Sequence, residues 1–178
     1  MVQHEVNLKD RQPEKTLLVV FSYHHMNTDK VARVFAKVLE AQVKPPQKSS
    51  PGEIGDYDLV GFGSGIDSGR HYKELLDFTD QLPRVAGKKA FIFSTNGAPA
   101  SLFGESMSCD QMAKNHRIIK EKLQGKGYLI VGEFTCPGFN TNLFLKHIGG
   151  LNKGRPNEED LERAEAFARG LVQEPEEK

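Results

Sequence analysis

Short apolar runs alternate along the chain with stretches in which apolar residues recur at helical spacing. The run at residues 16–21 (TLLVVF) is bounded by polar residues, which is typical of a strand buried on both faces of a sheet. In residues 28–40, the apolar positions 31, 34, 35, 38 and 39 fall on one face of a helix. Runs of the same two kinds predict further strands at 57–62, 89–94 and 128–134, and further helices at 70–82, 111–124 and 157–171.

Strands and helices that alternate at this spacing predict an α/β protein, with a doubly wound parallel sheet covered by helices on both faces. The 178 residues fit one domain, because domains average roughly 100–200 residues. We expect this domain to span residues 16–172, between flexible polar segments at 1–15 and 173–178.

Composition narrows the class of protein without identifying a ligand. The chain carries 24 basic and 24 acidic side chains, so no net charge favours nucleic acid or an anionic membrane. No stretch approaches the roughly 18 apolar residues of a membrane span, and the polar start is unlike a signal peptide. Two cysteines favour a reducing compartment. We therefore expect a cytoplasmic protein that binds no nucleic acid and has no membrane span.

Four loops that follow predicted strands carry candidate binding chemistry, and ligands of such sheets bind at this edge. Residues 22–28 (SYHHMNT) enter a helix, where free backbone N–H groups suit a phosphate. Residues 61–69 (GFGSGIDSG) hold four glycines that let the backbone approach a flat ligand, and 94–99 (STNGAP) suit a heterocycle edge. In the loop 135–140, Phe139 could stack on a ring. Each loop alone also fits a helix cap, a turn or a core plug, but together they indicate a phosphorylated planar cofactor, and a mononucleotide fits best.

These segments resemble the flavodoxin-like family. The segment VVFSYHHMNTDKVARVFA is similar to the family's FMN-phosphate signature, with Phe21, the pair Asn27-Thr28 and Ala32 in matching positions. GFGSGID and FSTNGAP resemble the two loops that hold the isoalloxazine ring. A stand-alone branch known as "flavodoxin family protein" shares the His-His-x-Asn-Thr loop, the GFGSGI loop, a GEFxCxGF segment and a tail like KGRPNEEDLERAEAFA. The resemblance implies a flavodoxin-like three-layer sandwich, with a five-stranded parallel sheet of order 2-1-3-4-5, and FMN as the cofactor.

The resemblance also assigns the cofactor contacts to three groups of residues. The phosphate group comprises Ser22, His24, His25, Asn27 and Thr28. The residues beside the ring are Gly63, Ser64, Gly65 and Ile66, and those at its pyrimidine edge are Ser94, Thr95, Asn96 and Gly97. The resemblance does not assign the residue that covers the ring, because the chain has no Trp. The candidates are Ile66, His71, Tyr72, Phe103 and Phe139. Few cations occur in the ring loops, Arg70 excepted, which predicts a low flavin potential.

The resemblance leaves the reaction open. One interpretation is an FMN-binding electron carrier, or an FMN-dependent oxidoreductase such as an NAD(P)H- or quinone-dependent flavin reductase. Its partner would be a redox protein or a small-molecule electron donor or acceptor, and the chain would be a monomer or a weak dimer. Another interpretation is a non-redox binding protein that has lost FMN, because Tyr23 and Met26 replace the family's usual hydroxyl residue and glycine.

Two other kinds of chemistry have weaker support in the sequence. Cys109 and Cys136 could approach each other at the sheet edge, but no CxxC motif occurs and an inert loop thiol at Cys136 is the simpler interpretation. No Cys/His spacing completes a metal site. The segment 153–155 (KGR) fits a solvated connector or a contact with a phosphate or an acidic partner.

Overall fold

A six-stranded sheet organises the molecule, which we describe from a computed structural model covering residues 15–99 and 105–172. Five strands are parallel and lie in the order β2-β1-β3-β5-β6, while β4 pairs antiparallel with β3. The strands are β1 (Thr16–Phe21), β2 (Gln42–Lys44), β3 (Leu59–Asp67), β4 (Arg70–His71), β5 (Lys88–Asn96) and β6 (Tyr128–Pro137). Counted among themselves, the parallel strands have order 2-1-3-4-5, which confirms the predicted flavodoxin-like fold class.

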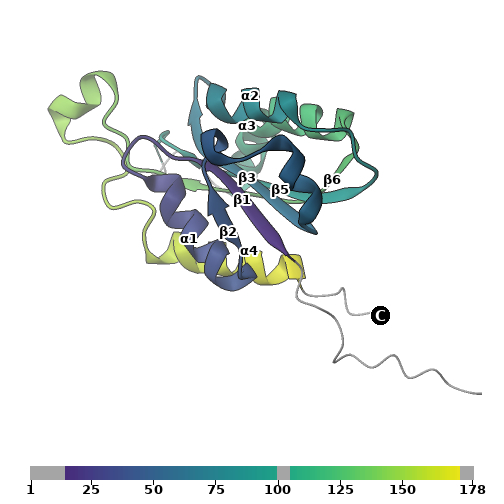
Figure 1. Ribbon diagram of the computed structural model, residues 1–178. Helices are drawn as coiled ribbons and strands as arrows, with labels where there is room; N and C mark the ends of the chain where they lie inside the picture. Colours follow the sequence, from purple (N-terminus) through teal and green to yellow (C-terminus); the bar gives the residue numbers. More distant parts are fainter. Residues whose placement is uncertain (1–14, 100–104, 173–178) are drawn as a thin grey trace, which may run out of the picture.

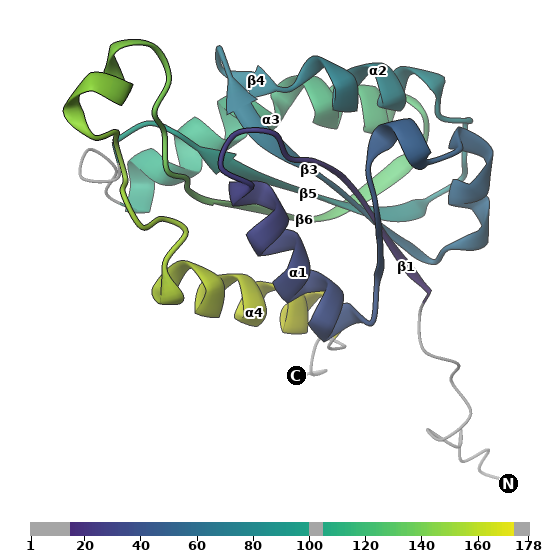
Figure 2. The same ribbon diagram turned by 60° about the vertical axis from the view of Figure 1, so that its left-hand side comes forward.

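Helices cover both faces of the sheet, with α1 and α4 on one face and α2 and α3 on the other (Figures 1 and 2). The α-helices are α1 (Asn27–Leu39), α2 (Lys73–Gln81), α3 (Glu105–Gly125) and α4 (Glu158–Val172). Short 3-10 helices are η1 (Pro46–Lys48), η2 (Pro51–Asp56) and η4 (Leu143–Ile148). None of the helices among the described residues is long and apolar enough to cross a bilayer.

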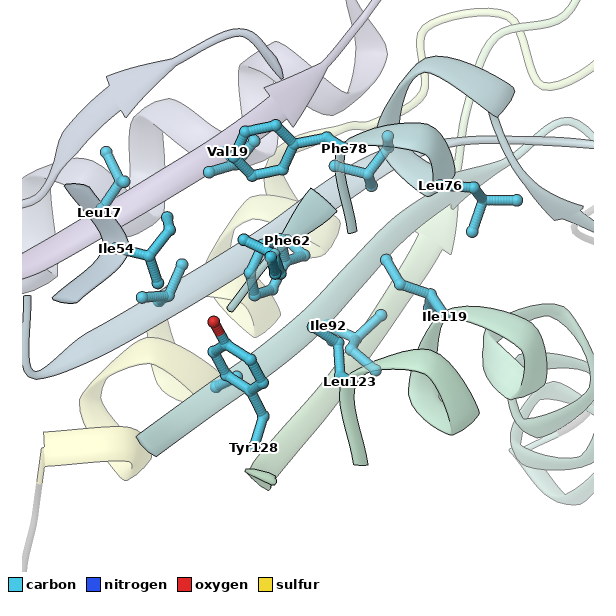
Figure 3. Close-up of a cluster of buried hydrophobic side chains, with 14 residues drawn as sticks. Leu17, Val19, Ile54, Phe62, Leu76, Phe78, Ile92, Ile119, Leu123 and Tyr128 are labelled. Atoms are coloured by element: carbon cyan, nitrogen blue, oxygen red, sulfur yellow. The ribbon is translucent and has the colours of Figure 1, made fainter. Parts of the chain in front are cut away.

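Each face of the sheet has its own apolar core. Toward α1 and α4, the Phe35 ring is fully buried and meets the rings of Phe91, Phe93 and Phe134 nearly edge-on, with centroids 5.0–5.6 Å apart. Edge-to-face contacts add about 0.5–1.5 kcal/mol per pair beyond the burial of apolar area. The second cluster packs α2, α3 and η2 against the other face, and Figure 3 shows its side chains from Leu17 to Tyr128.

Several elements begin or end at other residues than predicted: α3 begins at Glu105 rather than at 111, and β3 begins at Leu59 rather than at 57. The helix predicted from residue 70 begins at Lys73, because Arg70 and His71 instead form β4 after the turn at Ser68 and Gly69, which adopt φ angles of 51° and 78°. The strands also extend into the predicted loops, to residues 67, 96 and 137. The ends predicted at 1–15 and 173–178 lie, apart from Lys15, outside the described residues, as does Phe103.

Candidate functional site

A pocket opens where the carboxyl ends of β1, β3, β5 and β6 meet. Its enclosed volume is about 40 Å³, and about 400 Å³ is free when the adjoining open solvent is included. Ligand pockets commonly measure about 300–1,000 Å³, so an organic ligand here would lie largely in the open part of the pocket. Its lining residues are Ser22, Tyr23, His24, Asn27, Thr28, Gly65, Ile66, Tyr72, Thr95, Gly97, Gly138, Phe139, Asn140 and Asn142. No Lys, Arg, Asp or Glu occurs among these described lining residues.

The loop between β1 and α1 forms an anion-binding concavity. His25 and Met26 both adopt left-handed backbone, with φ angles of 55° and 53°, and Asn27 begins α1. A left-handed residue followed by a helical one directs consecutive N–H groups toward one point, an arrangement known as a nest. The helix dipole adds partial positive charge there, so a bound anion is stabilised. Two consecutive non-glycine residues in this strained conformation point to a functional constraint.

Side chains hold this nest in place from inside the loop. Ser22 Oγ accepts a hydrogen bond from the Asp29 backbone N–H at 3.1 Å, which caps the first turn of α1. The hydroxyls of Thr28 and Thr95 are hydrogen-bonded at 2.8 Å and are buried. Asn27 donates through Nδ2 to the Phe139 carbonyl at 2.8 Å, whereas its buried Oδ1 has no partner among the described residues. The loop is therefore fixed to β5 and to the segment that follows β6.

The two histidines of the loop bind to a segment that follows β6. His24 Nε2 and His25 Nε2 lie 3.2 and 2.8 Å from the Thr141 hydroxyl, and the His25 ring lies 4.4 Å from that of Phe139. Burial lowers the pKa of His25 from its usual value, and the nearby His24 and Lys30 lower it further. His25 is therefore neutral at pH 7 and supports the loop rather than supplying a charge.

A strap formed by residues 138–152 extends outward from this end of the sheet. It projects beside the β1–α1 loop in Figure 2 and contains η4. Its two limbs pair at Asn140 and Leu151, and Asn140 Nδ2 donates to the Gly97 carbonyl at 3.2 Å. The strap thus connects the loop after β1 with the end of β5 and closes one side of the pocket.

The β3–β4 hairpin forms the opposite wall. Gly65 and Ile66 line the pocket, and Tyr72 lies against them and 5.4 Å from the Phe21 ring. A Cβ atom on Gly65 would lie 2.9 Å from the Tyr72 ring, so a side chain at this position would displace the aromatic ring. Burial, followed by the nearby Asp67, raises the pKa of Tyr72, so its hydroxyl is neutral at physiological pH.

The pocket brings together eight of the thirteen residues predicted to bind the cofactor. These are Ser22, His24, Asn27, Thr28, Gly65, Ile66, Thr95 and Gly97. The other five do not line it. His25 contacts Phe139, and Asn96 accepts a hydrogen bond from the Ala98 N–H. Gly63, Ser64 and Ser94 are buried in the sheet.

Several lining residues were missing from the predicted site. Tyr23, Gly138, Asn140 and Asn142 line the pocket although the sequence analysis assigned none of them to the site. The candidate binding loop 135–140 includes Gly138 and Asn140, but only Phe139 among its residues was considered as a ligand contact. Of the residues considered for covering a ring, Ile66, Tyr72 and Phe139 line the pocket, whereas His71 is buried behind it.

The cysteines do not form a thiol centre. Cys109 is exposed on α3, whereas Cys136 is buried in β6, and both are free. Burial, followed by the charge of Asp160, raises the pKa of the Cys136 thiol far above its usual value, so it stays protonated and unreactive. Among the described residues, no three His, Cys, Asp or Glu side chains gather as metal ligands would.

Solved structures with this fold are flavodoxins and larger proteins that contain a similar unit. Oxidised flavodoxin 2 from Bacillus cereus is 22% identical and superimposes with a TM-score of 0.62, covering 88% of this chain and 97% of that one. Rubredoxin oxygen:oxidoreductase from Desulfovibrio gigas is 18% identical with a TM-score of 0.57, and the match covers 88% of this chain and 36% of that one. These likenesses define a protein of the flavodoxin-like fold family.

A sequence relative identifies the chain more narrowly. The uncharacterized protein MJ0298 of Methanocaldococcus jannaschii is 43% identical over 158 residues, which cover 89% of this chain and 98% of that protein. No established protein-family model matches the chain. The chain belongs to the same family as MJ0298, within the flavodoxin-like fold.

Proposed function

We propose that this protein binds FMN non-covalently in the pocket and acts in electron transfer. The observation that carries the proposal is the nest at residues 25–28, which lies beside a pocket at the carboxyl edge of a flavodoxin-like sheet. The likeness to flavodoxins, together with the sequence motifs, supports FMN as the mononucleotide.

The residues present fit the phosphate end of FMN. The N–H groups at the start of α1 have no acceptor within the helix, which suits a dianion. Charge-assisted hydrogen bonds contribute about 1.5–3 kcal/mol each, so two or three of them would bind a phosphate without a lysine. The unpartnered Asn27 Oδ1 is an acceptor beside the nest, which matches the hydroxyl groups of a ribityl chain.

The other end of the pocket offers groups that an aromatic ring would contact. Tyr72 and Ile66 offer apolar surface, while Thr95 and the backbone at Gly97 offer polar groups for the ring edge. FMN, when bound, would supply reversible one- or two-electron chemistry, and these residues would bind and orient it. Because the described lining residues include no Lys, Arg, Asp or Glu, a charged reduced ring would gain no stabilisation from such side chains there. Arg70 is exposed on the hairpin and is not one of the lining residues, which supports a low potential.

Neither departure from the flavodoxin motif fills the pocket. Tyr23 stands at the rim with 75% of its surface exposed, and Met26 is 48% exposed. Met26 also adopts the left-handed backbone that a glycine would favour, so the nest keeps its shape. Electron donors and acceptors of either kind, a redox protein or a small molecule, would reach the flavin through the solvent-facing side of the pocket.

The phosphate contacts can be tested with a fluorescence titration of FMN, whose emission is quenched on binding. We expect one-to-one binding by the natural chain, and a dissociation constant at least tenfold higher for the double variant Asn27→Ala/Thr28→Ala. The matched control is Thr28→Ser, which keeps the hydroxyl that bonds Thr95 and should bind within about threefold of the natural chain.

Two outcomes of this titration would contradict the proposal. An equal dissociation constant for the natural chain and the double variant would remove the phosphate assignment. Unquenched FMN with the natural chain would favour a binding protein of the same fold that does not use flavin.

A further inference from the structure

A cluster of buried polar side chains lies directly behind the hairpin wall of the pocket. Ser64 and Ser94 occupy paired positions on β3 and β5, and His71 and His116 approach them from β4 and α3. All four are at most 1% exposed. Burying polar groups costs free energy unless they are hydrogen-bonded, so their partners decide what the cluster does.

Ser64 Oγ is the centre of the contacts that hold the hairpin. It donates to the Gly65 carbonyl at 2.8 Å, accepts the Tyr72 backbone N–H at 3.1 Å and lies 2.8 Å from His71 Nδ1. The single hydroxyl proton of Ser64 serves Gly65, so His71 must donate through Nδ1–H. This bond joins the second strand of the hairpin to the first, immediately behind Gly65 and Ile66.

That arrangement leaves His71 Nε2 as a buried nitrogen with no partner among the described residues. The His71 ring faces the His116 ring at a centroid distance of 5.0 Å. Burial, followed by the charge of His116, lowers the pKa of His71 well below its usual value. A proton on Nε2 would find no acceptor among the described side chains, and it would face a second imidazole.

His116 is held by groups of its own. Its Nε2 lies 2.8 Å from Ser94 Oγ, and its Nδ1 lies 3.1 Å from Glu133 Oε2 on β6. Glu133 also pairs with Lys120 of α3. The hydrogen bond from His116, with that from Lys120, lowers the pKa of Glu133 to about 2. The carboxylate therefore stays charged at neutral pH and fixes His116 in place, so His116 cannot turn to accept a proton from His71.

The pairing that joins β4 to the sheet is short. β4 has two residues and pairs with β3 at only two positions, Ile66 with His71 and Asp67 with Arg70. Its loss would leave the parallel strands intact. Short elements with few contacts open locally well before a protein unfolds.

We propose that neutral His71 is a positioning residue that closes the β3–β4 wall of the pocket, and that its protonation opens this wall. The role in cofactor binding rests on the proposed FMN site, because Gly65 and Ile66 of the hairpin line that site. The groups around the cluster are His116 and Lys120 of α3, Glu133 of β6, Asp67 and Arg70 of the hairpin, and Tyr72 at the start of α2.

The direction of the pH effect follows from proton linkage. In the closed hairpin His71 binds no proton near neutral pH, whereas in the open hairpin its pKa returns to about 6.5. The open form therefore binds more protons, and acid favours opening. For one histidine, the opening equilibrium rises about tenfold between pH 7.5 and pH 5.5.

Amide hydrogen exchange, measured by NMR on the full chain without added flavin, tests this directly. We expect the protection factors of the amides at residues 66–71 to fall about tenfold between pH 7.5 and 5.5. Amides of residues 59–62, in the first half of β3, should keep their protection factors. His71→Asn retains a donor for Ser64 without an ionisable ring, so its hairpin protection should not depend on pH over this range.

Constant protection of the natural hairpin, or the same fall in His71→Asn, would overturn the proposal. Should the variant fail to fold, ring ¹⁵N shifts of the natural chain give the answer, because a charged His71 at pH 7 would also overturn it. Adding FMN separates the two proposals. If FMN leaves the hydrogen exchange unchanged while the pH effect persists, the proposed FMN site is contradicted, whereas the proposed role of His71 in closing the hairpin is supported.

Discussion

At the scale of single residues, the β1–α1 loop is the place where backbone strain and chemistry coincide. Met26 occupies the position at which the family usually has glycine, and it adopts a φ of 53° with 48% of its surface exposed. A side chain in this conformation costs about 1–2 kcal/mol relative to the usual helical backbone. The buried anchors on either side, Asn27 with Phe139 and Ser22 with Asp29, offset that cost by fixing the loop.

Replacing Met26 with glycine should therefore be harmless or stabilising. The gain from relieved strain exceeds or equals the roughly 0.5–1 kcal/mol that glycine costs through the entropy of the unfolded chain. Urea unfolding should show a free energy of unfolding for Met26→Gly between unchanged and about 1 kcal/mol higher. Lys37→Gly, at an exposed position inside α1, is the control and should lower it by about 1 kcal/mol. If Met26→Gly lowered the free energy of unfolding as much as Lys37→Gly does, the loop would not be strained.

At the scale of elements, the strands and helices follow the hydrophobic pattern closely, and the departures have local causes. The run at 16–21 corresponds to β1, and Val31, Phe35 and Leu39 are the buried stripe of α1 as the spacing predicted. β4 was missed because two residues carry no periodicity. The Ser68-Gly69 pair that turns the chain there was the available signal, since such pairs are typical of tight turns.

The strap and the buried cluster are harder to predict, because their contacts join residues far apart in the sequence. Thr141 meets His24 across 117 positions, and Ser94 meets His116 across 22. No local propensity favours either contact. Similarly, Gly63 was expected near a ligand, but its missing side chain makes room for Phe93, whose ring lies 2.2 Å from where a Cβ atom would stand. The glycines of this segment therefore have two roles, since Gly63 makes room in the core and Gly65 lines the pocket.

The link between α3 and β6 gives the protein an acid-sensitive contact. The pKa of Glu133 is lowered to about 2 by hydrogen bonds from His116 and Lys120. A lowered carboxyl pKa stabilises the fold above the unfolded value of about 4.5, and this contribution is lost as pH falls from about 4.5 toward 2. Thermal unfolding of Glu133→Gln should therefore depend less steeply on pH between 5 and 2 than that of the natural chain.

Glu121→Gln provides the matched control for that measurement. Glu121 also lies on a salt bridge, with Arg117 of the same helix, but its side chain is 62% exposed. Exposed ion pairs contribute little to stability, so the unfolding temperature of Glu121→Gln should depend on pH between 5 and 2 as that of the natural chain does. If the unfolding temperatures of the natural chain and Glu133→Gln depended equally on pH, the acid sensitivity would not come from Glu133.

At the scale of the whole molecule, the sheet brings loops from four strands to one edge, as the alternating pattern predicted. The chain has no formal net charge, and no Lys, Arg, Asp or Glu lines the pocket in the part of the chain that the structure describes. Binding of an anionic cofactor would therefore depend on backbone N–H groups and the dipole of α1. An overall electrostatic field contributes little in such a chain. The strap, of which the loop pattern indicated only residues up to 140, completes the pocket from the β6 side.

The most direct test of the flavin site compares FMN with riboflavin, which has the same ring and ribityl chain but lacks the phosphate. Isothermal titration should show one-to-one binding of FMN at least about 100-fold tighter than that of riboflavin, since two charge-assisted hydrogen bonds contribute about 3 kcal/mol or more. Equal affinities would contradict the nest as a phosphate site. Binding of neither compound would contradict the flavin assignment altogether.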